Sequence, residues 1–61
     1  MTKLKLKRIE LKWKLRQVAE LLNVTPQTVQ QMERHGVRKP VTAKRYAAAL
    51  SCKPEEILEF D

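Results

Sequence analysis

The clearest hydrophobic pattern lies in residues 15–22, LRQVAELL. Apolar side chains recur there at helical spacing, at Leu15, Val18, Ala19 and Leu22. This spacing gathers them on one face of an amphipathic helix. Asn23 follows, and asparagine tolerates the left-handed backbone conformation that often ends a helix. We therefore predict a helix over residues 15–22 and a tight turn after it, with Val24 pointing into the core.

A second helix is predicted directly after this turn. Thr25 can cap its exposed amides, and Pro26 at the first helical position loses no hydrogen bond. Val29 and Met32 form a narrow apolar edge. The broad remaining face is polar and consists of Gln27, Thr28, Gln30, Gln31 and Arg34. Gly36 follows the end of the pattern, so this helix presents much more polar surface than it buries.

Residues 3–14, KLKLKRIELKWK, carry two competing patterns. Apolar residues alternate along part of the run, which is typical of a half-buried strand. The residues are nevertheless good helix formers, with no valine or threonine among them. At helical spacing, Leu4, Arg8 and Leu11 share one face. We predict a helix over residues 3–14; the alternatives are a strand, or a basic amphipathic helix lying on a membrane surface.

Two more helices are predicted in the second half of the chain. The segment from Thr42 to Leu50 has an inner apolar face formed by Ala43, Tyr46, Ala47 and Leu50. Pro54 begins a short fifth helix, whose first turn holds two glutamates that interact favourably with the helix dipole. No repeat, linker or low-complexity segment divides the chain. The sequence therefore predicts one domain over residues 1–61, all-α, with five helices around a single core.

Composition indicates a class of partner and argues against several kinds of chemistry. The net charge of +6 attracts polyanions through counterion release, whatever their sequence. Cys52, His35 and Gly36 are each the only residue of their type. The chain therefore lacks the residue clusters of a metal site or catalytic centre and the glycines of a phosphate loop. We expect no enzyme, no cofactor and no metal.

The same reasoning bears on location. No apolar run is long enough to cross a membrane, and the basic start, MTKLKLKRIE, lacks the apolar stretch of a signal peptide. We therefore expect a cytoplasmic protein.

The segment VAELLNVTPQTVQQME, with RIELKW before it and RKP and AAALSCKPEEIL after it, resembles a known family. It is similar to the Cro proteins and repressor N-terminal domains of lambdoid phages, which are the Cro/CI-type, XRE-like helix-turn-helix proteins. The likeness extends from about Leu4 to Phe60, with the helix-turn-helix at about residues 15–34. It implies a compact lambda-repressor-like domain that binds DNA in the cytoplasm of a bacterial host, at the nucleoid when bound.

The resemblance also implies a role for individual positions. Arg8 and Glu33 form a structural salt bridge between the first and third helices. The second helix of the motif lies in the major groove, where glutamine can pair with adenine. The residues that read bases are Gln27, Thr28 and Gln31. The residues that contact phosphates are Lys14, Gln17, Thr25, Gln30, Arg34, Arg38 and Lys39.

Three positions depart from the family pattern. Leu15 stands where a glutamine commonly contacts phosphate. Pro26 replaces a common polar residue that reads bases, so base reading shifts to the residues after it. His35 makes the end of the recognition helix unusual, and we expect it in a loop.

These implications converge on a sequence-specific regulator of transcription. We predict a Cro-like phage repressor that binds palindromic operators in double-stranded DNA as a homodimer, weak and formed mainly on DNA. The expected dimer contacts are Cys52, Pro54, Ile57, Leu58 and Phe60. No membrane or small-molecule ligand is expected. The alternatives are the DNA-binding antitoxin of a toxin–antitoxin pair and a basic RNA-binding or architectural helical protein.

Overall fold

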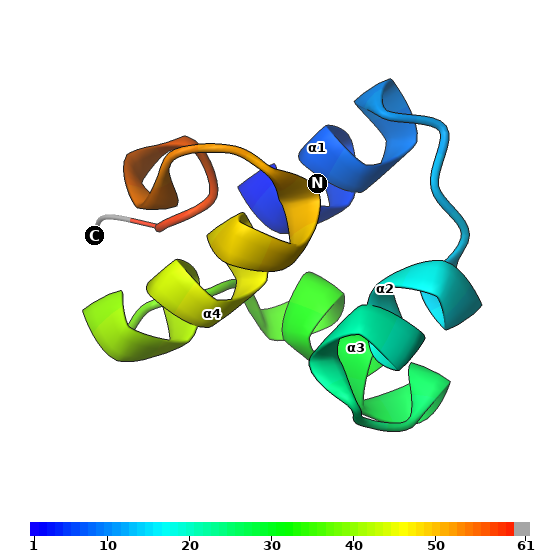
Figure 1. The fold of residues 1–61 in the computed structure, drawn as a ribbon. Helices are drawn as coiled ribbons and strands as arrows, with labels where there is room; N and C mark the ends of the chain where they lie inside the picture. Colours follow the sequence, from blue (N-terminus) through cyan, green and yellow to red (C-terminus); the bar gives the residue numbers. More distant parts are fainter. Residues whose placement is uncertain (60–61) are drawn as a thin grey trace.

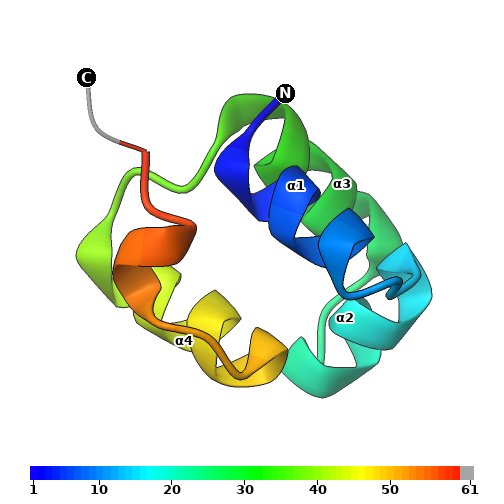
Figure 2. The same cartoon turned by 90° about the horizontal axis from the view of Figure 1, so that it is seen from above.

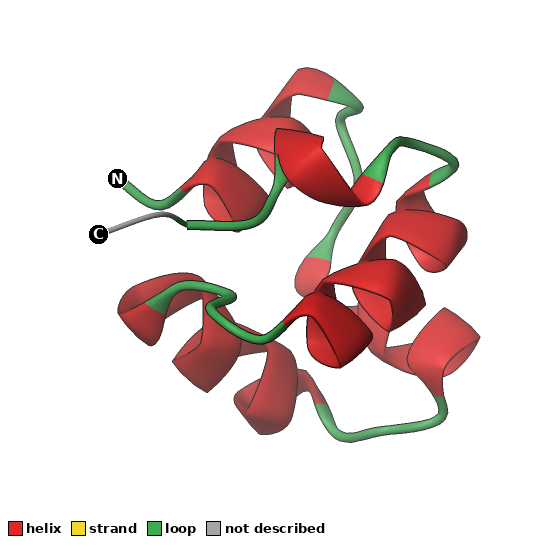
Figure 3. Ribbon diagram, turned by 90° about the vertical axis from the view of Figure 1, so that its left-hand side faces the viewer, coloured by secondary structure: helices red, strands yellow, loops and turns green. Residues whose placement is uncertain are grey.

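The computed structural model describes residues 1–59, and all of their regular structure is helical (Figures 1 and 3). The elements are α1 (Lys3–Glu10), α2 (Leu15–Leu22), α3 (Pro26–His35), α4 (Pro40–Leu50) and the 3-10 turn η1 (Pro54–Glu56). The all-α prediction is confirmed. The prediction of five helices is wrong, because the fifth is a single 3-10 turn.

Helix α1 is shorter than predicted. Thr2 caps its start, since the Thr2 Oγ1 accepts a hydrogen bond from the amide of Lys5 at 3.3 Å. The helix ends at Glu10 instead of continuing to Lys14. Lys12 takes a left-handed conformation with φ 60°, which reverses the chain. This turn brings the Trp13 side chain against the core from outside the helix.

Helix α4 begins two positions earlier than the apolar pattern suggested. Pro40 occupies its first turn, where a missing amide costs no hydrogen bond, and Lys39 is the N-cap. The helix ends at Leu50, followed by Ser51 in the left-handed conformation with φ 55°. Proline therefore marks the start of both α3 and α4.

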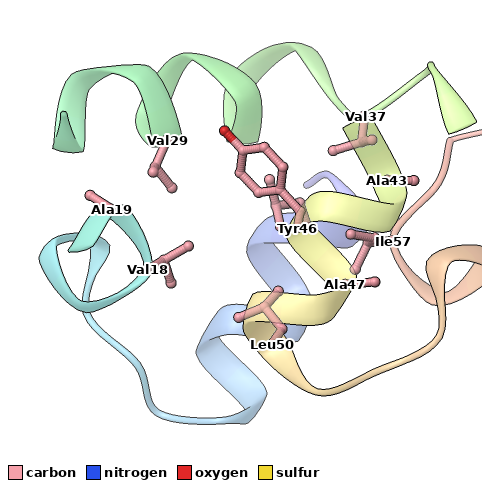
Figure 4. Packing of buried hydrophobic residues seen from close by; sticks show 10 residues of the cluster. Val18, Ala19, Val29, Val37, Ala43, Tyr46, Ala47, Leu50 and Ile57 are labelled. Carbon is pink, nitrogen blue, oxygen red and sulfur yellow. The ribbon is translucent and has the colours of Figure 1, made fainter. Parts of the chain in front are cut away.

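The core lies where the four helices and the C-terminal segment meet. Figure 2 shows α1, α2 and α3 along one side and α4 with η1 along the other. The buried side chains, most of them visible in Figure 4, are Leu4, Val18, Ala19, Val29, Val37, Ala43, Tyr46, Ala47, Leu50 and Ile57. Burying each larger aliphatic side chain contributes about 1.5–3 kcal/mol, so this cluster is what fixes α3 in place.

The segment after η1 returns to the loop that follows α3. Val37 and Leu58 form an isolated parallel bridge, and the Glu59 amide donates to the Val37 carbonyl at 2.7 Å. Gly36 lies beside them with φ 89°, and a Cβ there would lie 2.8 Å from the Glu59 Cγ. The positive φ favours glycine at this position, and any larger residue would also require the Glu59 side chain to move.

Candidate nucleic-acid interface

The turn between α2 and α3 sets the angle between the two helices. Asn23 has the predicted left-handed conformation, with φ 59° and ψ 43°, and ends α2. The Val24 amide donates to the Ala19 carbonyl at 3.0 Å, and the Val24 side chain packs against the core. Thr25 caps α3, because its Oγ1 accepts from the Thr28 amide at 3.3 Å. These contacts hold α3 across α2 as a helix-turn-helix (Figure 1).

The outer face of α3 is polar and open to solvent. On its inner face Val29 is fully buried and Glu33 is 5% exposed. The exposed side chains are Gln27, Thr28, Gln30, Gln31 and Arg34. All of these except Thr28 surround a shallow hollow of about 200 Å³. The three residues predicted to read bases therefore lie on one accessible helix surface.

Arg8 of α1 pairs with Glu33 of α3 beneath this surface. The Arg8 Nε donates to the Glu33 Oε2, and the Arg8 Nη2 donates to the Glu33 Oε1 at 3.2 Å. The remaining nitrogen, Nη1, donates to the Trp13 carbonyl at 2.7 Å. Two parallel bonds to one carboxylate fix orientation as well as distance. The pair therefore holds α1 against the C-terminal half of α3, as the resemblance implied.

Lys14 and Gln17 lie together at the N-terminus of α2. The Gln17 Oε1 accepts from the Lys14 amide at 2.8 Å, which satisfies one of the free amides of the helix end. The side-chain NH2 group of Gln17 is then the part of this residue that can donate to a phosphate oxygen. Leu15, by contrast, is half-buried against the core. The family's glutamine contact is thus replaced by packing at this position.

A larger groove of about 670 Å³ lies at the other end of α3. Three predicted phosphate contacts line it: Gln30, Arg34 and Arg38. Sequence reasoning missed its other walls, which include Thr2, Lys5 and Glu59. Lys5 had a usable signal, because it precedes Arg8 by one helical turn and so shares its face. Thr2 and Glu59 reach the groove because segments distant in sequence are hydrogen-bonded to each other, and no local sequence pattern predicts such contacts.

The other singled-out residues are spread around these two surfaces. Lys39 is exposed at the N-cap of α4 and lines neither hollow. Pro26 is exposed at the first position of α3. His35 is the last residue of α3, not a loop residue as expected, and it lines the larger groove.

The expected dimer contacts have different degrees of exposure. Ile57 is fully buried in the core of one chain, so its side chain is not available to a second copy in this structure. Cys52, Pro54 and Leu58 are partly exposed. Phe60 lies outside the described residues. The structure therefore corrects the set by assigning Ile57 to the core.

The Cys52 thiol and the Tyr46 hydroxyl are not activated as nucleophiles by their surroundings. Burial raises the pKa of the Cys52 thiol and the pKa of the Tyr46 hydroxyl, so both groups stay protonated near neutral pH. A nucleophilic thiol needs the opposite shift. Within residues 1–59, no group of three or more His, Cys, Asp and Glu side chains could hold a metal ion. No helix in this part of the chain is long and apolar enough to cross a membrane.

Comparison with known proteins gives the class of the protein. The helix-turn-helix family model matches residues 4–57, from within α1 to the residue after η1. The chain therefore belongs to the helix-turn-helix family, the broad group that includes the Cro and repressor types. Membership makes it, in general terms, a sequence-specific DNA-binding regulator of transcription, and the family is not a catalytic one. No curated protein and no solved structure matched the chain.

Proposed function

We propose that this protein is a Cro-like repressor that inserts α3 into the major groove of a palindromic operator and blocks access to a promoter. The observation that carries the proposal is the exposed polar face of α3, mounted on a buried edge formed by Val29 and Glu33. A helix held in this way can enter a groove without losing its packing. The proposed location is the cytoplasm of a bacterial host.

Base reading is assigned to the first two turns of α3. Gln27 and Gln31 are one turn apart and line the same shallow hollow, so both amides can reach neighbouring base edges. Glutamine pairs bidentately with adenine N6 and N7. The Thr28 Oγ1 lies 3.0 Å from the Thr25 Oγ1. Since this hydroxyl already has a partner, the Thr28 methyl is the better group for recognition, and it suits the methyl of thymine.

The remaining predicted contacts fix the position of the helix on DNA. Lys14 and Gln17 stand at the N-terminus of α2, whereas Arg34 and Arg38 line the groove at the far end of α3. We assign the DNA backbone on either side of the major groove to these two groups. Thr25, Gln30 and Lys39 complete the set. Such contacts set register and affinity without reading sequence.

A homodimer is part of the proposal. Half-sites lie about 34 Å apart along DNA, while the chain measures 28 × 21 × 20 Å. Two copies on adjacent half-sites therefore meet only at their edges. Pro54 and Leu58 are the partly exposed apolar candidates for such a contact. The small area available supports a dimer that is weak in solution and forms on the operator.

Selection of bound duplexes from a random pool tests the function. A dimeric repressor enriches one two-fold symmetric site, and a monomeric binder enriches a single half-site.

Gln31→Ala should lose about 1–3 kcal/mol of discrimination at one base pair of each half-site. Lys39→Ala should instead weaken binding to all duplexes alike and lower the salt dependence by about one ion.

These measurements use fluorescence anisotropy on the selected site and on single-base variants of it. Equal binding of the wild type to every duplex would refute sequence-specific recognition. Gln31→Ala with the wild-type preference at every base pair would remove the assigned reading role.

A further inference from the structure

The larger groove beside α3 is not accounted for by the recognition helix. It has a volume of about 670 Å³ and lies between the start of α1, the end of α3 and the loop after α3. Its walls include Thr2, Lys5, Gln30, Arg34, Arg38 and Glu59. The start of α1, the end of α3 with its following loop, and the segment that carries Glu59 are far apart in sequence and converge on this hollow.

Hydrogen bonds hold these walls in place without a ligand. The Thr2 Oγ1 donates to the Glu33 carbonyl, which joins the cap of α1 to the last turn of α3. The Glu59 amide donates to the Val37 carbonyl at 2.7 Å, which joins the C-terminal segment to the loop that carries Arg38. A groove that exists before binding does not have to be ordered at the moment of binding, so less free energy is lost.

The groove carries an excess of positive charge. Lys5, Arg34 and Arg38 contribute cationic side chains. The Glu33 carboxylate of the groove is already paired with Arg8, and the Glu59 Oε2 accepts from the backbone amide of Lys3 at 3.4 Å. Lys5 is half-buried and takes part in none of the ion pairs among residues 1–59. Such a site favours an anion.

The groove is continuous with the surface that reads DNA. Gln30 and Arg34 line both this groove and the shallow hollow that contains Gln27 and Gln31. A DNA strand that leaves the shallow hollow along the end of α3 therefore reaches the cationic groove next. The anion best placed to occupy it is a phosphate of the same duplex.

We infer that this groove receives a backbone phosphate of the bound duplex, and that Lys5 of α1 is a phosphate-contact residue. The inference rests on the proposed function, because it assumes that α3 lies on duplex DNA. It extends the interface from the helix-turn-helix to the first helix. Thr2 and Glu59 are positioning residues, since they act by holding the walls.

Salt dependence of binding to an unselected duplex tests the role of Lys5. Lys5→Gln should lower the slope of log affinity against log salt by about 0.9, as expected for one lost phosphate contact. Between roughly 50 and 200 mM salt, its affinity should then fall about threefold less than that of the wild type. Lys5→Arg keeps the charge and should keep the wild-type slope. Lys53→Gln, between α4 and η1 and outside the groove, is the matched control and should also keep it.

A backbone scan locates the contact. Duplexes with a single neutral methylphosphonate at each position should bind the wild type less tightly wherever a phosphate is contacted. At one of those positions the methylphosphonate should not weaken the binding of Lys5→Gln any further, because this variant already lacks the contact. Identical slopes for Lys5→Gln and Lys53→Gln would overturn the inference, as would a changed slope only on single-stranded DNA or RNA. Thermal unfolding followed by circular dichroism confirms that each variant is folded.

The two proposals fail in different ways. If selection enriches no site while Lys5→Gln still lowers the slope on duplex DNA, sequence-specific recognition is refuted and the phosphate contact of Lys5 is supported. If selection enriches a site and Lys5→Gln behaves like Lys53→Gln, the function stands and the groove is not a phosphate site.

Discussion

The Arg8–Glu33 pair joins α1 to α3 and adds a directional contact to the hydrophobic packing of α3. Both side chains are largely removed from solvent, with 15% and 5% exposed. Charges in such a site are tolerated because each satisfies the other, so the pair specifies one arrangement of α1 and α3. Removing one partner is costly, because the remaining charge stays buried without its counter-charge.

Glu33→Gln removes this charge while keeping the shape of the side chain. We expect a loss of about 3 kcal/mol in the free energy of unfolding, out of roughly 3–9 kcal/mol for a domain of this size. Urea unfolding followed by Trp13 fluorescence measures it. Glu20→Gln, which neutralises an exposed carboxylate on α2, should change stability by less than about 0.5 kcal/mol. Equal effects of the two substitutions would contradict the structural role of the pair.

At the scale of elements, α2 and α3 could be predicted from local signals. The bounds of α2 follow from its apolar spacing and from Asn23, and the start of α3 follows from Thr25 and Pro26. The end of α1 could not be predicted in this way. Leu11 and Trp13 continue an apolar pattern, but the chain reverses at Lys12, where tertiary packing of Trp13 outweighs helix propensity.

The candidate interface likewise has one part that could be predicted from the sequence and one part that could not. The polar face of α3 could be predicted, because it follows from the helical period of one segment. The groove beside it could not, because Thr2 meets the carbonyl of a residue 31 positions away and Glu59 meets Val37 through backbone atoms. Backbone pairing between distant segments leaves no signature in side-chain patterns.

The cap of α3 offers a test at this scale. Thr25→Ala removes the oxygen that accepts from the Thr28 amide, so we expect α3 to fray and the protein to lose about 1 kcal/mol of stability. Thr25→Ser keeps the oxygen and should retain most of the wild-type stability. Thermal and urea unfolding compare the three proteins. The cap has no energetic role if Thr25→Ala and Thr25→Ser are equally stable.

At the scale of the whole molecule, an exposed pair links the two ends of the fold. The Lys7 Nζ of α1 donates to the Glu56 Oε1 of η1 at 3.1 Å, across 49 positions of sequence. The Glu56 Oε2 also accepts from the Lys53 amide at 2.7 Å. The Lys53 amide and then Lys7 lower the pKa of Glu56 below its ordinary value of 4.5. The hydrogen bond that Lys7 donates to Glu56 likewise raises the pKa of Lys7 above its ordinary value of 10.5.

These shifts make part of the stability depend on pH. Because the pKa of Glu56 is lower in the folded protein, its contribution is complete above the ordinary value of 4.5 and is lost as pH falls through the lowered folded value. The contribution of Lys7 is complete below 10.5 and is lost only as pH rises through its raised folded value. Near neutral pH both are present, so of these two groups it is Glu56 that changes the stability in acid.

Glu56→Gln keeps an oxygen for the Lys53 amide and removes only the charge. We expect this variant to be less stable than the wild type at neutral pH, and the difference to shrink toward zero as pH falls below 4.5. Added salt should also shrink it at neutral pH, because an exposed pair is screened. Urea unfolding across pH measures both effects. Glu55 makes neither of these contacts, so the neighbouring Glu55→Gln is the control and should not reproduce these effects of pH and salt. If the stability difference between Glu56→Gln and the wild type does not change with pH, the link does not depend on charge.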